Sequence, residues 1–101
     1  MVDTVELQVV WHLNPACRLH WRQLDGECLV YEEASGRTHQ LDAIAACTLM
    51  CLESDDLDLN GLLNLAARLL ETPANNTLSG QVIEAVRQFQ ALGILLVRSP
   101  A

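Results

Sequence analysis

Apolar and polar residues alternate at the start of the chain, which is the pattern of a half-buried β-strand. Every second residue from Val5 to Leu13 is apolar, and Asn14-Pro15 ends the alternation. We therefore expect an extra N-terminal strand within residues 1–14. The pattern leaves the pairing partner of this strand open.

A run of three short strands is predicted next. An alternating segment that begins at Leu19 ends at Asp25-Gly26, a dipeptide typical of two-residue hairpin turns. The returning strand spans residues 28–32, and Gly36 supplies the positive φ for a second turn. Residues 37–41 then run back beside the returning strand. The predicted result is a three-stranded antiparallel meander.

The hydrophobic period then changes from that of a strand to that of a helix. Asp42 is a good N-cap residue because its carboxylate accepts the free amide protons of the following turn, and it predicts a helix over residues 43–52. Residues 53–56 are polar and predict a loop. Leucines at helical spacing predict a second helix over residues 59–70. Two short helices with apolar faces are therefore expected to follow the strands.

A third helix is predicted after a polar connector at residues 72–77. It begins near Leu78 or Ser79 and ends at Gly93, which suits a C-terminal cap position, and residues 94–97 form a short terminal strand. The apolar stripe of this helix is predicted to contain Leu78, Val82, Val86, Phe89 and Leu92. A narrower line beside the stripe, with the spacing i, i+4 and i+7, contains Ile83, Arg87 and Gln90.

Three strands, three short helices and a terminal strand indicate a single α+β domain over residues 1–101, with a winged helix-turn-helix-like architecture. A chain of this length builds one core but is small for a cleft between lobes. Trp11 and Trp21 are expected in the core, since buried aromatic side chains dominate core energetics. A binding module is therefore expected before an enzyme.

Composition narrows the range of partners. Half of the residues are hydrophobic, but no apolar run approaches the roughly 20 residues that a membrane-spanning helix needs. Asp3 and Glu6 lie where a signal peptide would carry basic residues, so a cytoplasmic protein with no membrane partner is expected. The net charge of −7 repels phosphate backbones, which argues against nucleic acid as a partner.

Four cysteines raise the question of a metal site. Cys47 and Cys51 are four residues apart in a predicted helix and share a face, but no CxxC pair or neighbouring histidine completes a ligand set. Cys17 and Cys28 fall on separate strand segments with apolar neighbours. We favour small buried hydrophobic residues in a reducing compartment over metal ligands or disulfides, and we expect no cofactor.

A strand, a glycine-containing turn, a short strand ending in Leu-Asp and an Ala-rich helix follow one another in the middle of the chain. This order resembles the PqqD-like peptide chaperones, or RiPP recognition elements, over about residues 9–97. The residues that carry the resemblance are Val30-Tyr31, Ser35-Gly36, Thr38-His39-Gln40-Leu41-Asp42 and Ala45-Ala46. Similarity to the branch found in HPr-rel-A systems, named for an HPr-kinase-related protein, comes from Trp11, Leu13-Asn14-Pro15 and Trp21-Arg22.

The resemblance implies a non-catalytic peptide-binding domain. Members of this family bind the leader of a ribosomally synthesised precursor peptide as an extra strand, in a groove closed by the third helix, and present it to a modifying enzyme. An unpaired strand edge is a ready template for such β-augmentation. The implied partners are a leader peptide and a modifying enzyme or an HPr-kinase-related protein. Carried over onto this chain, the peptide-binding residues are Arg37, Thr38, His39, Gln40, Leu41, Ile83, Arg87 and Gln90.

Other function classes are weighed against peptide capture. His39 has no Ser or Cys nucleophile with an orienting acid near it in sequence, so catalysis has little support. A winged-helix DNA-binding regulator needs several basic residues on its recognition helix, whereas residues 78–92 carry only Arg87, with Glu84 beside it. A scaffold subunit of a kinase-related system without a peptide ligand stays open, as does a homodimer.

Overall fold

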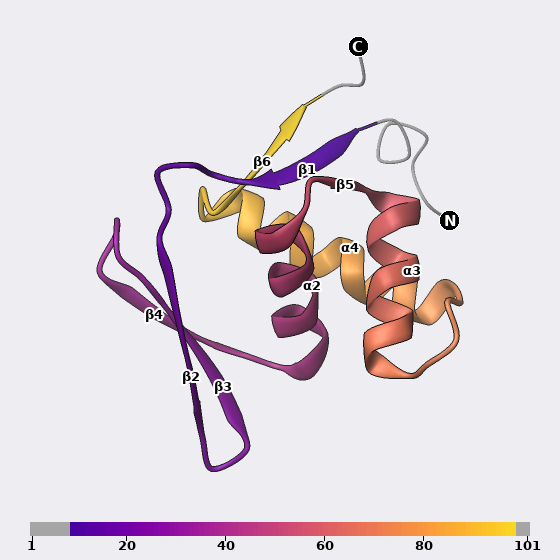
Figure 1. Ribbon diagram of the computed structural model, residues 1–101, viewed down its shortest axis with the longest axis horizontal. Helices are drawn as coiled ribbons and strands as arrows, with labels where there is room; N and C mark the ends of the chain where they lie inside the picture. Colours follow the sequence, from indigo (N-terminus) through magenta and orange to yellow (C-terminus); the bar gives the residue numbers. More distant parts are fainter. Residues whose placement is uncertain (1–8, 99–101) are drawn as a thin grey trace.

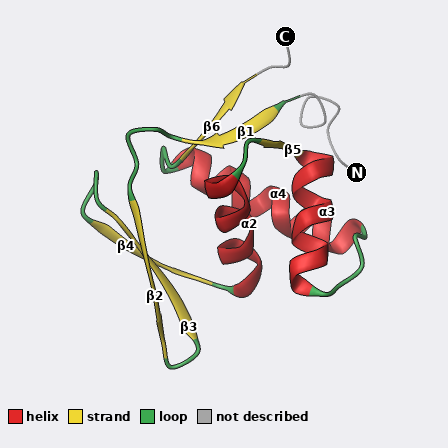
Figure 2. Ribbon diagram, viewed as in Figure 1, coloured by secondary structure: helices red, strands yellow, loops and turns green. Residues whose placement is uncertain are grey.

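Two antiparallel three-stranded sheets and three helices make up the part of the chain that the computed structural model describes, residues 9–98 (Figure 1, Figure 2). The predicted α+β class is confirmed. The part of the predicted N-terminal strand that precedes residue 9 lies outside the described residues. The elements are β1 (Val10–Leu13), β2 (Leu19–Leu24), β3 (Glu27–Glu32), β4 (Arg37–Leu41), α2 (Ala43–Ser54), β5 (Leu57–Asp58), α3 (Leu59–Leu70), α4 (Asn76–Ala91) and β6 (Leu95–Arg98).

In the first sheet, β3 pairs with β2 on one side and with β4 on the other, both antiparallel. The turn between β2 and β3 contains two residues with positive φ, Asp25 at 50° and Gly26 at 80°. Positive φ at both central residues defines the type I′ turn, whose twist matches that of a hairpin. Gly36 in the following turn has a φ of 73°, as predicted. The chain then reaches α2 directly from the end of β4 (Figure 1).

In the second sheet, β1 lies between β5 and β6. Trp11 of β1 is opposite Leu57 of β5 and Val97 of β6. The sequence predicted no strand at Leu57–Asp58, because two residues are too few to show a period. The predicted terminal strand is present and spans Leu95–Arg98, one residue later than expected.

Each helix begins after a residue whose side chain accepts a hydrogen bond from the backbone of the first turn. Asp42 accepts from the Ala45 N–H at 2.7 Å, which confirms the predicted cap of α2. Asp58 caps α3 and Asn75 caps α4 in the same way. Because Asn75 is the cap, α4 begins at Asn76, earlier than the predicted start near residue 78.

The core is built around α2, which packs against α3, α4, β1 and β4. Trp11 belongs to the core as predicted and is only 2% exposed. Trp21 is half-buried and donates its indole N–H to the Glu53 carboxylate at 3.0 Å. Leu92 was expected in the buried stripe of α4 but is 41% exposed, because it is the C-cap beyond the last turn. The largest fully buried side chains include Val30, Leu49, Leu52, Leu62, Val82 and Val86.

Gly36→Val should lower the free energy of unfolding by about 1–2 kcal/mol, the cost of placing a residue other than glycine in the left-handed region. A Cβ at Gly36 would meet no atom within 4 Å, so the loss reflects backbone strain and not a clash. Urea denaturation of the variant and the parent measures the difference. Identical unfolding curves would contradict the strained turn.

Gly80→Ala is the matched control for this measurement. Gly80 lies inside α4, and a Cβ there also meets no atom within 4 Å. Alanine should therefore raise the free energy of unfolding by about 0.5–1 kcal/mol, because glycine is the weaker helix former.

Candidate functional site

β4 is an edge strand of the first sheet. Within residues 9–98, the sheet order β2-β3-β4 leaves it paired with β3 on one side only. Three of its side chains, Arg37, Thr38 and Gln40, are exposed, and the other two, His39 and Leu41, are half-buried. A short polar edge of this kind resists aggregation and also offers free backbone groups to another strand.

The register of the sheet determines which backbone groups of β4 face away from β3. In an antiparallel ladder, successive residues of a strand direct their N–H and C=O groups to opposite sides. On β3 the N–H of Glu33 donates to the Arg18 carbonyl on the β2 side at 3.0 Å, and the Glu32 carbonyl accepts from the Gly36 N–H on the β4 side at 2.9 Å. Even-numbered residues of β3 therefore bond to β4.

The same alternation extends to β4 through the observed partners. Glu32 is opposite Arg37, and Val30 is opposite His39. Arg37, His39 and Leu41 consequently direct their backbone groups to β3. Thr38 and Gln40 direct theirs outward, so each offers an N–H and a C=O at the free edge.

The side chains of β4 divide between two faces. His39 and Leu41 share the inner face of the sheet with their partners Val30 and Cys28, which are buried against the helices. Thr38 and Gln40 lie on the opposite, outer face. The His39 Nε2 atom is buried and has no hydrogen-bond partner among the described residues.

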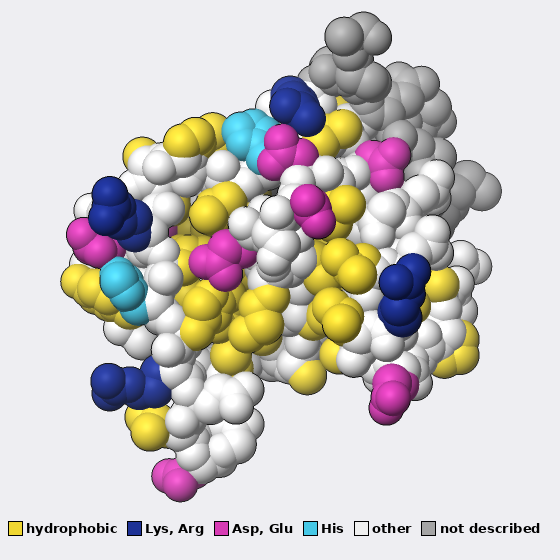
Figure 3. All heavy atoms as spheres, viewed as in Figure 1, with side chains coloured by type: hydrophobic (Ala, Val, Ile, Leu, Met, Phe, Trp, Pro, Cys, Tyr) yellow, Lys and Arg dark blue, Asp and Glu magenta, His cyan; other side chains and the backbone are white. Residues whose placement is uncertain are grey.

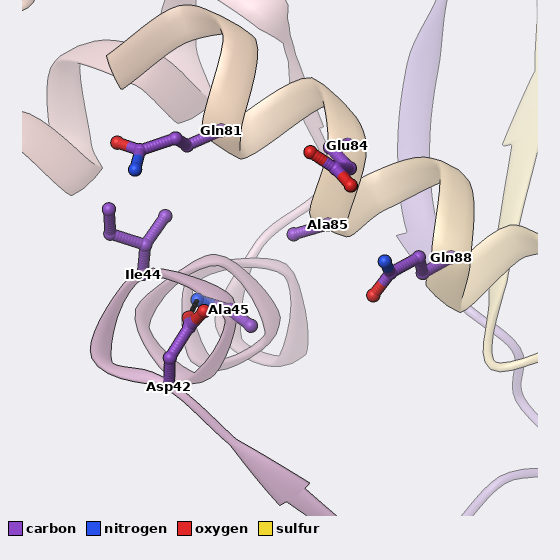
Figure 4. A pocket seen from close by; sticks show the side chains of 7 residues that line it. All are labelled: Asp42, Ile44, Ala45, Gln81, Glu84, Ala85 and Gln88. Atoms are coloured by element: carbon purple, nitrogen blue, oxygen red, sulfur yellow. Dashed lines mark hydrogen bonds between the residues drawn. The ribbon is translucent and has the colours of Figure 1, made fainter. Parts of the chain in front are cut away.

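A small pocket lies beside the junction of β4 and α2, where α4 passes over the first turn of α2 (Figure 4). Its volume is about 180 Å³. Ala45 and Ala85 lie between the two helices, while carboxylates and amides stand around them (Figure 4). We call this space the α2–α4 pocket; its lining residues are Asp42, Ile44, Ala45, Gln81, Glu84, Ala85 and Gln88.

The three α4 residues expected to wall a groove beside β4 do not line this pocket. Ile83 is 7% exposed and belongs to the core, so a charge at this position would test the core and not a groove. Gln90 accepts a hydrogen bond from the Trp11 indole N–H at 3.2 Å, on the side of β1. Arg87 is exposed and does not line the pocket.

The pocket is lined by the α4 residues on the opposite side of the buried stripe from Ile83, Arg87 and Gln90. A helix that buries one stripe has a partly exposed flank on each side of it. Ile83, Arg87 and Gln90 form one flank, and Gln81, Glu84, Ala85 and Gln88 form the other. The helical spacing of the second set is visible in the sequence, but spacing does not say which flank faces α2.

A larger and more apolar groove lies between the β2–β3 hairpin, α2 and the end of α3, with a volume of about 520 Å³. Leu69 and Met50, which line it, are 62% and 38% exposed. Hydrophobic side chains gather between the hairpin and the helices on the face seen in Figure 3. We call this space the hairpin groove; its apolar lining includes Cys28, Ala46, Cys47, Met50, Leu69 and Leu70.

All four cysteines are free thiols, and the pKa is raised at three of them. Burial raises the pKa of Cys51 from 9.0 to about 12, and the neighbouring Cys47 thiol adds to the shift. Burial also raises the pKa of Cys47, and at Cys17 burial and then the Glu32 carboxylate raise it. Among residues 9–98, no three His, Cys, Asp or Glu side chains are grouped as metal ligands.

Comparison with known proteins identifies no relative from which the role of the site could be transferred. No protein-family model, curated protein or solved structure matches this chain. Within the described range, no helix is both long enough and apolar enough to cross a membrane.

The free energy of unfolding should fall as the pH rises above about 9. In the folded protein the Cys51 thiol keeps its proton up to about pH 12, whereas in the unfolded chain it ionises near pH 9.0. Between these values the unfolded state binds fewer protons, so rising pH favours unfolding. Urea denaturation at a series of pH values measures the slope. Cys51→Ala should reduce it, and an unchanged slope would assign the effect to other groups.

Proposed function

We propose that this protein is a non-catalytic peptide-binding domain that captures the leader of a ribosomally synthesised precursor peptide and presents it to a modifying enzyme. The observation that carries the proposal is the outward direction of the Thr38 and Gln40 backbone groups at an exposed strand edge. An extended peptide that pairs with these groups becomes a fourth strand of the sheet beside β4.

The energetics of strand addition suit this edge. Each backbone hydrogen bond contributes about 0.5–1.5 kcal/mol net, so the edge supplies a modest affinity that does not depend on peptide sequence. Selectivity must then come from side-chain pockets beside the edge. The α2–α4 pocket is a candidate, because Asp42 lines it and directly follows the last residue of β4.

The proposal also covers the family to which the domain is related, its cellular compartment and its partners. The resemblance of residues 30–46 to the PqqD-like peptide chaperones supports a winged helix-turn-helix-like interpretation, with the β2–β3–β4 sheet as the wing-like part. On this proposal the domain works in the cytoplasm beside a modifying enzyme or an HPr-kinase-related protein, and neither nucleic acid nor a membrane is a partner. The surplus of acidic residues supports the exclusion of nucleic acid.

A scaffold subunit is the alternative function, and the hairpin groove favours it. Leu69 and Met50 expose apolar surface of the kind that mediates protein association. A scaffold would use this groove, which Gln40 and Leu41 of β4 also line, and would not need the backbone groups at the free edge of β4. The two functions therefore predict sensitivity at different residues.

Thr38→Pro should abolish peptide binding and leave the fold largely intact. Proline lacks an N–H, and the N–H of Thr38 faces away from β3. His39→Pro removes an N–H that bonds to β3, so this variant should lose stability instead. Calorimetric titration with a precursor leader encoded beside the gene measures affinity, and circular dichroism measures folding.

Thr38→Val is the matched control, because it changes the same side chain but keeps the backbone N–H. It should bind the leader within about twofold of the parent. A folded Thr38→Pro variant that binds as tightly as the parent would exclude the β4 edge as the binding site. Loss of a partner protein with Leu69→Glu, together with full partner binding by Thr38→Pro, would support the scaffold instead.

A further inference from the structure

The α2–α4 pocket adjoins the end of β4 through Asp42, the residue that directly follows this strand. Asp42 lines both this pocket and the hairpin groove, so the two spaces meet at the junction of β4 and α2. The hairpin groove is lined by residues of β2, β3 and the end of β4, among them Gln23, Cys28 and Leu41. The α2–α4 pocket is walled by α2 and α4 instead, and its lining includes no residue of β2 or β3, the strands on the paired side of β4.

Strand geometry determines which residue of a captured peptide points into this pocket. Side chains directly opposite each other on neighbouring strands share a face of the sheet, whether the strands are parallel or antiparallel. Leu41 faces inward and packs against the core. The peptide residue opposite Leu41 therefore faces the helices, level with the end of β4, where Asp42 lines the pocket.

The pocket has the size of one side chain. Its volume of about 180 Å³ is below the roughly 300–1,000 Å³ of sites that hold small molecules. One long side chain fills such a space, and a cofactor does not.

The lining of the pocket combines apolar and acidic groups. Ile44 and Ala85 supply apolar surface. Asp42, at the N-cap of α2, and Glu84, on α4, place carboxylates on either side of the space (Figure 4). Within residues 9–98 neither carboxylate has an ion-pair partner. Asp42 uses one oxygen to cap α2 through the Ala45 N–H. Its charge is compatible with this role, since an anion at a helix N-terminus is stabilised.

Lysine and arginine fit this lining better than other side chains. Each packs a long aliphatic stem along apolar surface and keeps its cationic group near water and acceptors. The net charge of −7 attracts a basic peptide and repels an acidic one. We propose that the α2–α4 pocket is the specificity pocket of the β4 edge and takes one Lys or Arg side chain of the captured peptide, at the position opposite Leu41. This inference rests on the proposed peptide capture.

The expected contribution of the pocket is modest. Asp42 and Glu84 are exposed, so each pairs with the bound cation in a high dielectric. Replacing the basic residue of the peptide with an uncharged one should therefore weaken binding about three- to tenfold. The effect should shrink at high salt, because exposed charges are screened.

Selection from random peptides tests the inference without knowledge of the natural leader. The probe is a displayed library of random peptides of about a dozen residues, selected separately on three forms of the protein. These are the parent, the pocket variant Asp42→Asn with Glu84→Gln, and a control with the same change in net charge at Asp25→Asn and Glu71→Gln. Asparagine keeps the cap of α2 and also suits the type I′ turn, so both variants should fold.

The parent and the control should enrich peptides with Lys or Arg at one fixed position, and the pocket variant should enrich peptides without that preference. In an enriched peptide, replacing this lysine with norleucine should weaken binding to the parent and leave binding to the pocket variant unchanged. A double-mutant cycle then gives the coupling free energy between the peptide lysine and the two pocket carboxylates.

The selection separates the failure of the inference from the failure of the proposed function. Enrichment on the parent with no fixed basic position, or a basic preference that persists on the pocket variant, overturns the specificity pocket and leaves strand capture intact. If the parent enriches no peptide whose binding Thr38→Pro removes, strand capture itself fails and the specificity pocket fails with it.

Discussion

The tight turn at Asp25-Gly26 sets the strand register that determines which backbone groups β4 presents at its free edge. A two-residue type I′ turn allows one register between β2 and β3, and β3 passes that register to β4. A slip of one residue would move the fully buried Val30 to the outer face and bring the exposed Tyr31 inward. Exposing the valine alone would cost about 1.5–3 kcal/mol. The outward direction of the Thr38 and Gln40 backbone groups follows from this register.

The second constraint is the abrupt passage from β4 to α2. Asp42 is the only residue between the strand and the helix, and its side chain caps the first turn. The start of α2 is therefore held next to the end of the edge strand. Because α2 also packs on α4, Asp42 and the side of α4 that carries Glu84 line one pocket. One capping residue thus links the edge to the pocket.

The two surfaces of the domain have different chemistry, and this difference separates the functions considered for it. The β4 edge is polar and the α2–α4 pocket is acidic, which suits an extended chain with a basic side chain at the pocket. The hairpin groove is apolar, with Leu69 largely exposed, and suits the surface of a folded partner.

The sequence by itself determined most of the local structure. Strand alternation, the glycine turns and the cap at Asp42 are set by residues close together in the chain, so they were readable without a fold. The same patterns identified β4 as short and polar. Only the tertiary structure decided that β1 pairs with both β5 and β6 and that α4 turns the side of Glu84, and not that of Ile83, toward the pocket. The physical reason is that periodicity reports which face of an element is buried, whereas the partner that buries it comes from distant residues.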